Sequence, residues 1–368
     1  MSDQNRLHQL HDAGQSPWLD NLRRGWLTSG ELARWVERGI RGITSNPSIF
    51  QKAIGSGTDY DEQFGDLVAG GTDVTTAYWD LVTTDIAEAL ALLRPVYDES
   101  DGVDGFVSVE VAPELARDAA GTEAAARQLH ERIAAPNLYV KIPGTAEGLA
   151  PIRQLIAEGR SINVTLIFSL ERYAEVMEAY LAGLEQAEGD LSRISSVASF
   201  FISRVDTEVD RRLEEIGTPE ALDLRGKAAV AQGQLAYQRF LETFSGPRWE
   251  ALAARGARVQ RPLWASTSTK NPAYPDTLYV DQLIGPDTVN TMPEDTIEAF
   301  LDHGTVARTV DADPAAAQAL LDQIADVGVD MADVARVLED QGVAAFAKSF
   351  DELIAALDAK ATELRAGG

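Results

Sequence analysis

The sequence contains no cysteine and only four histidines, which limits the chemistry that the chain can carry. Without thiolates it cannot form disulfides, iron–sulfur clusters or zinc sites with cysteine ligands. His8 and His11 are spaced to share one face of a helix, but no further ligands of a suitable kind lie nearby in the sequence. P-loop, H-E-x-x-H and EF-hand patterns are also missing. We therefore predict no bound metal.

Positive charge is scarce as well. The chain has 32 lysines and arginines against 58 acidic residues, a formal net charge of -26. Such a field repels phosphate backbones and anionic lipid surfaces, so we expect neither nucleic acid nor a membrane as a partner. An anionic substrate would need a local cluster of cations that overcomes this field.

Long apolar runs are missing too. No uncharged run approaches the roughly 18 residues of a membrane span, and the polar start MSDQNRLHQLHDAG lacks the apolar core of a signal peptide. We therefore expect a cytoplasmic protein. The composition, 45% hydrophobic and 24% charged, is that of an ordinary globular chain. It does not reveal whether the protein is a monomer or a homo-oligomer.

Short apolar segments recur along the chain, and stretches with helical spacing lie between them. Strands that are almost continuously apolar indicate a parallel sheet covered on both faces. The alternative, a doubly wound sheet, lacks its G-x-G-x-x-G fingerprint after every expected strand. About eight strand–helix units predict an α/β fold, the (β/α)8 TIM barrel. The expected strands lie within residues 16–22, 40–50, 105–113, 137–145, 161–170, 194–204, 259–268 and 276–284.

Helix formers dominate several of the intervening segments. Residues 121–133 and 170–187 combine them with apolar residues on one face. Two further regions interrupt the alternation of strands and helices, residues about 219–258 and the alanine-rich residues 314–364. We interpret the first as a helical insertion and the second as a helical C-terminal extension, both belonging to a single domain over residues 1–368.

The segment LYVKIPGT, residues 138–145, places Lys141 among the apolar residues of an expected strand. Barrels carry their reactive groups at the carboxyl ends of the strands. Burial disfavours the ammonium form, and a neutral amine can attack a ketone or aldehyde to form a Schiff base. The alternatives are a lysine paired with a carboxylate such as Glu110, or one that reaches solvent at the strand end.

Two segments, GITSNPSIF and LYVKIPGTAEGL, together resemble the signature regions of transaldolases, enzymes of sugar-phosphate metabolism. SINVTLIFS, SVASFFISRVD and LWASTSTKNP fit the same family in order and spacing, so the resemblance covers nearly the whole chain. It implies a (β/α)8 barrel and a transferase of the pentose phosphate pathway. Such enzymes move a dihydroxyacetone unit from a ketose phosphate, sedoheptulose 7-phosphate or fructose 6-phosphate, to an aldose phosphate, glyceraldehyde 3-phosphate or erythrose 4-phosphate. The partners are then small sugar phosphates, and no cofactor is needed.

The resemblance also implies four catalytic residues. Lys141 matches the Schiff-base lysine of the family's fourth strand, and Asp20 matches the aspartate that takes a proton from the C4 hydroxyl of the donor. Glu110 matches a glutamate that acts through a water held together with a threonine, here Thr165. From the residues alone, Asp20 could equally cap the next helix, Glu110 could simply pair with Lys141, and Thr165 could be an ordinary strand residue.

Four further residues match positions at which the family would contact the sugar. The amides of Asn46 and Asn163 can donate to and accept from its hydroxyls. Ser199 also matches the family, and Phe201 is expected to wall the reactive carbon. On their own, Asn46 before a proline would be a turn residue and Phe201 a core residue.

Phosphate recognition is assigned to three residues. Arg204 offers a planar fork suited to phosphate, and Ser266 an oxygen ligand. The second arginine that the family pattern places soon after this serine is missing, and STSTKN carries a two-residue insertion. Lys270 is our substitute, with a solvated loop lysine as the alternative.

The sequence leaves two rival functions open. A fructose-6-phosphate aldolase of the same superfamily would release free dihydroxyacetone; such relatives are shorter and typically carry glutamine and tyrosine where this chain has Glu110 and Phe201. A catalytically inactive barrel that only binds sugar phosphates would not need Lys141, Asp20 and Glu110 together.

Overall fold

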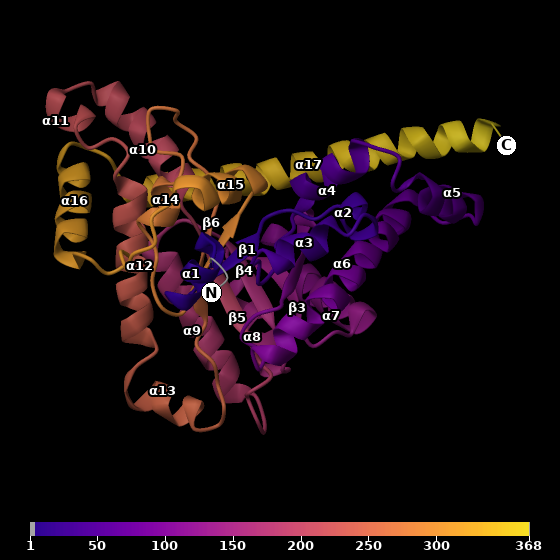
Figure 1. Ribbon diagram of the computed structural model, residues 1–368, viewed down its shortest axis with the longest axis horizontal. Coiled ribbons are helices and arrows are strands. Elements are labelled where there is room, and N and C mark those ends of the chain that lie inside the picture. The colour runs from indigo at the N-terminus through magenta and orange to yellow at the C-terminus, as the bar shows by residue number, and fades with distance from the viewer. Residues whose placement is uncertain (1–3, 368) are drawn as a thin grey trace.

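The computed structural model describes residues 4–367 and contains one seven-stranded parallel sheet (Figure 1). The strands follow one another around the sheet in the order β1-β7-β6-β5-β4-β3-β2. Every strand is buried along its whole length, as expected for a parallel sheet covered by helices. The bounds are β1 Gln15–Leu19, β2 Val107–Glu110, β3 Leu138–Pro143, β4 Ile162–Ile167, β5 Ser196–Phe201, β6 Arg261–Ala265 and β7 Thr288–Met292.

The eighth position of the barrel is filled by the segment around Ile43. This residue forms parallel bridges to Leu19 of β1 and to Val107 of β2. Its amide donates to the carbonyl of Phe106, and the amide of Ser108 donates to its carbonyl. The segment thus joins the two edge strands and completes a (β/α)8 barrel, which confirms the predicted fold.

One expected strand was wrong. Residues 276–284 contain the helix α14, Leu278–Asp281, and the strand comes later, as β7. Tyr279, Val280, Leu283 and Ile284 are buried at a helical spacing of three and four residues. β7 was missed because three of its five residues, TVNTM, are polar. Its polar side chains are buried; the Oδ1 of Asn290 accepts from Thr267 at 2.8 Å, whereas its Nδ2 has no hydrogen-bond partner among residues 4–367.

Helices surround this sheet. Both helical segments expected between the strands are present, as α7 and α9. None of the helices among residues 4–367 is long and apolar enough to cross a membrane. In the first two thirds of the chain the bounds are α1 Arg6–Asp12, α2 Arg24–Thr28, α3 Glu31–Glu37, α4 Pro47–Gly55, α5 Asp61–Ala69, α6 Val74–Glu99, η1 Pro113–Arg117, α7 Ala119–Ile133, α8 Leu149–Ala157, α9 Leu170–Gln186 and α10 Ser203–Ile216.

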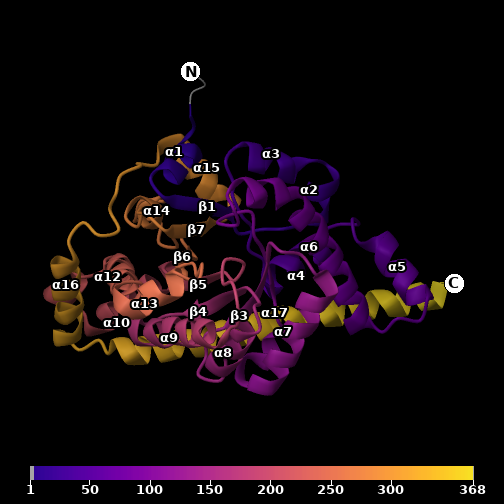
Figure 2. The same ribbon diagram turned by 90° about the horizontal axis from the view of Figure 1, so that it is seen from below.

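The remaining helices include those of the two additions. α17 is about 55 Å long at 1.5 Å per residue. It passes from α10 and α16 to α4 and α5, as Figures 1 and 2 both show. We propose that barrel and additions form one domain, because a single hydrophobic cluster includes residues of both. The bounds are α11 Pro219–Leu222, α12 Ala228–Thr243, α13 Gly246–Ala253, α15 Glu294–His303, α16 Pro314–Asp326 and α17 Met331–Gly367.

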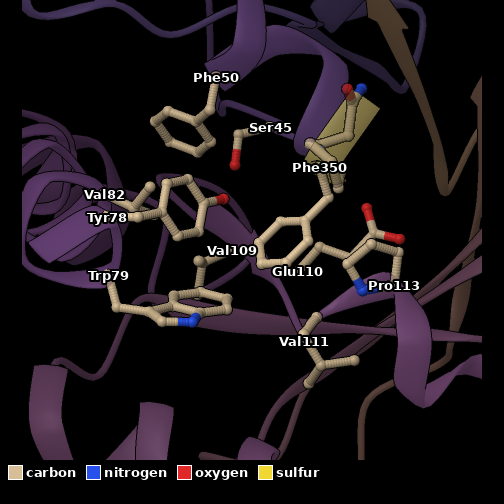
Figure 3. Close-up of a pocket in the computed structure, with 13 residues that line it drawn as sticks. Ser45, Phe50, Tyr78, Trp79, Val82, Val109, Glu110, Val111, Pro113 and Phe350 are labelled. Atoms are coloured by element: carbon tan, nitrogen blue, oxygen red, sulfur yellow. The ribbon is translucent and has the colours of Figure 1, made fainter. Parts of the chain in front are cut away.

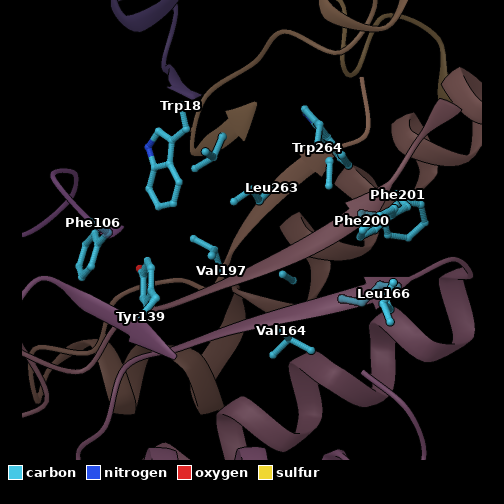
Figure 4. Packing of buried hydrophobic residues seen from close by; sticks show 14 of the residues in the cluster. Trp18, Phe106, Tyr139, Val164, Leu166, Val197, Phe200, Phe201, Leu263 and Trp264 are labelled. Atoms are coloured by element: carbon cyan, nitrogen blue, oxygen red, sulfur yellow. The ribbon is translucent and has the colours of Figure 1, made fainter. Parts of the chain in front are cut away.

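Aromatic side chains close the amino-terminal end of the barrel (Figure 4). The rings of Phe106 and Tyr139 stack with centroids 4.0 Å apart, and Trp18 lies 6.1 Å from Tyr139. Beside them the fully buried Asp104 accepts hydrogen bonds from Trp18 and from Arg261. With this end filled, the carboxyl ends of the strands are left to form a site.

Candidate active site

A pocket of about 290 Å³ lies at the carboxyl end of the barrel. Its walls come from the ends of six strands, from α4 and the residues before it, from α10, from the loop after β6 and from α17. Of the eleven predicted site residues, the two that do not line it, Glu110 and Asn163, lie behind it and contact residues that do. The predicted residues that line the pocket are Asp20, Asn46, Lys141, Thr165, Ser199, Phe201, Arg204, Ser266 and Lys270.

Lys141 reaches the pocket because side chains alternate along β3. Val140 and Ile142 point away from the barrel axis while Lys141 points inward. Its residue exposure is only 5%, and its Nζ donates to the carbonyl of Ser45 at 3.0 Å. The parallel register places Glu110 beside it, and Nζ lies 3.2 Å from the Glu110 Oε2. The lysine is therefore both buried and paired, so both sequence interpretations hold.

Glu110 is buried behind Lys141. Burial raises the pKa of its carboxyl above the ordinary value, opposed by the charge of Lys141 and reinforced by that of Asp20. Its Oε2 makes the ion-pair contact with Lys141 but no hydrogen bond of good geometry within the described chain. The buried Thr165 Oγ1 also has no hydrogen-bond partner among residues 4–367. Both oxygens keep capacity for a further hydrogen bond close to the lysine.

Two irregular backbone positions shape the site. The register between β4 and β5 shifts between Val164 and Ile167, and Leu166 adopts a φ of 59°. Ser266, directly after β6, has a φ of 56°. Left-handed conformations of this kind cost residues with a Cβ about 1–2 kcal/mol. Bulges re-aim side chains, and here Thr165 lies at the bulge and lines the pocket.

Asp20 follows β1 directly and is held from two sides. Its amide donates to the carbonyl of Met292, and its Oδ1 accepts from the Thr44 hydroxyl at 2.7 Å. Thr44 Oγ1 also lies 2.6 Å from Thr291 Oγ1. Burial raises the pKa of Asp20, while Lys141 and the Thr44 hydrogen bond oppose the rise. Asp20 does not cap the next helix, whose N-cap residue is Arg23.

The two asparagines occupy different layers. Asn46 is the N-cap of α4, where its Oδ1 accepts from the amide of Ile49 at 3.0 Å, and it lines the pocket. Asn163 is fully buried and donates to Ser108 at 3.0 Å. It also accepts from Ser199 at 2.7 Å, so it orients a pocket residue from behind.

Three cations face the pocket without acidic partners. Within residues 4–367, Arg204, Lys270 and Lys52 have no carboxylate within 4.0 Å, although most other arginines of the described chain do. Arg204 lies over the ring of Phe201, 5.2 Å from its centroid. Burial and the charges of Arg204 and Lys52 lower the pKa of Lys270. These residues form the local positive cluster that an anionic substrate needs against the net charge of -26.

Nine lining residues were not predicted from the sequence, among them Thr44, Lys52, Thr291 and Phe346. Thr44 lies two residues before Asn46 in a quoted motif, so alternation along the segment was the available signal. Lys52 lies on α4, after the motif. Thr291 belongs to the missed strand β7. Phe346 comes from α17, and no local pattern reveals where that helix docks.

Comparisons with known proteins agree on one family. The family model for Transaldolase/Fructose-6-phosphate aldolase matches residues 17–357. A curated protein of Thermobifida fusca (strain YX), named Transaldolase, is 55% identical over 353 residues, 95% of this chain and 96% of the relative. Transaldolase of Mycolicibacterium smegmatis is 52% identical over 359 residues, 96% of this chain and 97% of the relative. Transaldolase 1 of Streptomyces avermitilis is 51% identical over 367 residues, which are 98% of this chain and 96% of the relative.

Proposed function

The chain belongs to the transaldolase/fructose-6-phosphate aldolase family, and we propose that it is a transaldolase in which Lys141 forms the Schiff base. It is an enzyme of the pentose phosphate pathway that transfers a dihydroxyacetone unit between sugar phosphates. The observation that carries the residue assignment is the buried Lys141 Nζ, 3.2 Å from Glu110, at the base of a pocket that also holds Asp20 and three cations. A cytoplasmic location stays a prediction.

Schiff-base formation begins with proton transfer. An ammonium cannot attack a carbonyl, so Lys141 must first lose a proton. Glu110 is the carboxylate beside it, and burial favours the protonated form of that acid. We assign Glu110 the proton transfers of carbinolamine formation and dehydration, through a water that Thr165 also holds. The free capacity of the two buried oxygens supports this assignment. Positioned proton transfer contributes about 10²- to 10⁴-fold.

Asp20 acts on the next bond. It takes the proton of the C4 hydroxyl, the C3–C4 bond breaks, and the electron pair passes into the protonated imine on Lys141. The aldose phosphate leaves with C4 as its aldehyde carbon. The enamine that remains adds through C3 to the acceptor aldehyde, and Asp20 returns its proton to the new hydroxyl. Hydrolysis of the imine then frees the product and Lys141.

The remaining residues hold the substrate. Arg204, Ser266 and Lys270 bind the phosphate, and Lys52 adds a third cation on the same pocket. Asn46 and Ser199 bind hydroxyls of the sugar, with Asn163 orienting Ser199. Direct contact between Asn163 and the sugar stays a prediction. The ring of Phe201 forms the wall at the reactive end of the pocket.

The test traps the intermediate. Borohydride is added with fructose 6-phosphate, and the peptide that carries Lys141 is examined by mass spectrometry. We expect a reduced dihydroxyacetone adduct on Lys141, and we expect Lys141→Arg to abolish both adduct and transfer. An adduct on Lys52 or Lys270 instead, or transfer that survives Lys141→Arg, would overturn the assignment.

A second measurement separates transaldolase from the aldolase alternative. Free dihydroxyacetone is quantified during turnover of fructose 6-phosphate, with and without erythrose 4-phosphate as acceptor. A transaldolase turns over only with the acceptor present and releases little free ketone. Release at the full rate without an acceptor would favour the aldolase. No turnover and no adduct in a folded protein would favour a barrel that only binds sugar phosphates.

A further inference from the structure

The long helix α17 reaches the active site with two aromatic side chains one turn apart. Phe346 lines the substrate pocket, and Phe350 lines a second, smaller cavity; Asn46 lines both. Because residues four apart share a helix face, one face of α17 serves both cavities. Figure 3 shows Phe350 pointing from α17 toward Tyr78 and Glu110.

The second cavity lies behind the Glu110 carboxyl and is closed by apolar side chains. Its volume is about 10 Å³, room for about one water. Tyr78 and Phe350 meet edge to face with centroids 5.3 Å apart, and their exposures are 3% and 6%. Within the described chain, Phe350 is the cavity residue that α17 contributes. Its ring is therefore the part of the wall that does not belong to the barrel or its first helices.

Polar contacts fix α17 to α4 on either side of this ring. Ser48 and Ser349 lie 2.7 Å apart through their hydroxyls, and Gln51 donates to Glu352 at 2.6 Å. Asn46, the N-cap residue of α4, lines both cavities. The position of Phe350 is thus tied to the helix that carries part of the substrate pocket.

We propose that α17 completes the active site through Phe350, a positioning residue that keeps bulk water from the rear of the Glu110 carboxyl. The proposal rests on the assignment of Glu110 as the proton carrier of the transaldolase reaction. Phe350 touches neither the sugar nor the reacting atoms and acts only through Glu110.

The electrostatic consequence can be worked out from the groups that face Glu110. Lys141 on β3 favours its carboxylate, Asp20 after β1 disfavours it, and the uncharged Tyr78 of α6 shares the rear cavity. Burial is the largest cause of its raised pKa. If the ring of Phe350 is removed, water enters behind the carboxyl and stabilises the ionised form. The limb of the pH–rate profile that reports Glu110 then moves to lower pH.

The experiment is the pH dependence of kcat and kcat/KM for Phe350→Ala against the unchanged protein. We expect the Glu110 limb to move to lower pH and kcat at neutral pH to fall by up to about 100-fold, the lower end of what positioned proton transfer contributes. The same substitution in a Glu110→Gln background should move no limb. An unmoved profile in Phe350→Ala, or an equal movement without Glu110, would overturn the proposal.

Two further variants separate this role from helix docking. Leu353→Ala truncates another buried residue of α17 that lines neither cavity, and it should lower stability without moving the profile. If Phe350→Ala does not fold, Phe350→Leu carries the test, with a smaller movement in the same direction. Borohydride trapping on Lys141 is measured in parallel. An adduct with an unmoved profile refutes only the role of Phe350, whereas no adduct in the unchanged protein refutes the proposed function.

Discussion

The hydroxyl of Thr44 offers the sharpest test of Asp20 as the catalytic base. Thr44 Oγ1 donates to Asp20 Oδ1 at 2.7 Å and lies 2.6 Å from Thr291 Oγ1. A hydroxyl has one proton to donate. Because Thr44 donates its proton in the hydrogen bond to Asp20, Thr291 must be the donor in the hydrogen bond between Thr291 and Thr44. Thr44→Val keeps the shape of the side chain and removes the hydrogen bond to Asp20.

The size and sign of the effect follow from this bond. A hydrogen bond to an ionised group contributes about 1.5–3 kcal/mol, equivalent to about 10- to 150-fold in the ratio of ionised to protonated Asp20. Burial already raises the pKa of Asp20 and the Thr44 bond opposes that rise, so Thr44→Val raises the pKa further. A base must be ionised to act. We expect kcat/KM on the acid side to fall by about 10- to 150-fold, with most of the loss recovered at higher pH.

The assay is kcat/KM for fructose 6-phosphate with erythrose 4-phosphate as acceptor, measured across the acid limb. Thr44→Ser keeps the donor and should preserve the profile. Thr291→Val leaves the bond between Thr44 and Asp20 in place and should have the smaller effect of the two valine variants. A uniform loss of rate at every pH in Thr44→Val, or a serine variant that behaves like valine, would refute the reasoning.

Two further predictions concern stability and phosphate binding. Burial raises the pKa of Asp206, which accepts from Tyr279 at 2.8 Å, to about 6 from 3.8. The unfolded chain ionises first, so the free energy of unfolding should fall by about 3 kcal/mol as the pH rises from about 4 to about 6. Asp206→Asn should remove that fall, measured by urea denaturation at several pH values. A free energy of unfolding that still falls equally with pH in this variant would contradict the prediction. Arg204→Gln should raise KM for fructose 6-phosphate by about 10-fold or more, and the exposed Lys52→Gln by less. Lys348→Gln, the same charge change outside the pocket, should leave KM unchanged, and an equal rise there would mean that only the overall field matters.

Nine of the eleven residues named from the sequence line one pocket, whereas one of the expected strands was wrong. Lys141 and Asp20 were found because barrel geometry collects strand ends at one face, so position along a strand translates directly into position in space. Strand β7 was missed because three of its five residues are polar and bond to residues of other segments, as Asn290 does to Thr267, so the strand lacks the apolar run on which strand recognition depended. Residues 276–284 were misread because a buried helical turn and a short buried strand are equally apolar.

The contributions of α17 and of the middle of α4 could not be predicted. Lys52, Phe346 and Phe350 reach the site only because α4 and α17 dock where they do, and docking depends on contacts between residues about 300 positions apart, such as Ser48 with Ser349. For Asn163 the sequence predicts only part of its position. Its inward orientation follows from alternation, but its depth below the pocket depends on the register of β4 and β5.

The left-handed backbone at Leu166 and Ser266 has a consequence for how this enzyme can change. Both residues lie beside the chemistry, and each holds its conformation at about 1–2 kcal/mol, a large share of the margin by which a folded domain is stable. A glycine at position 266 would relax the backbone but lose the hydroxyl proposed to bind phosphate. Selection for heat resistance alone would therefore favour losing features that the proposed reaction uses, and a laboratory lineage evolved without an activity screen would be expected to drift first at these two positions.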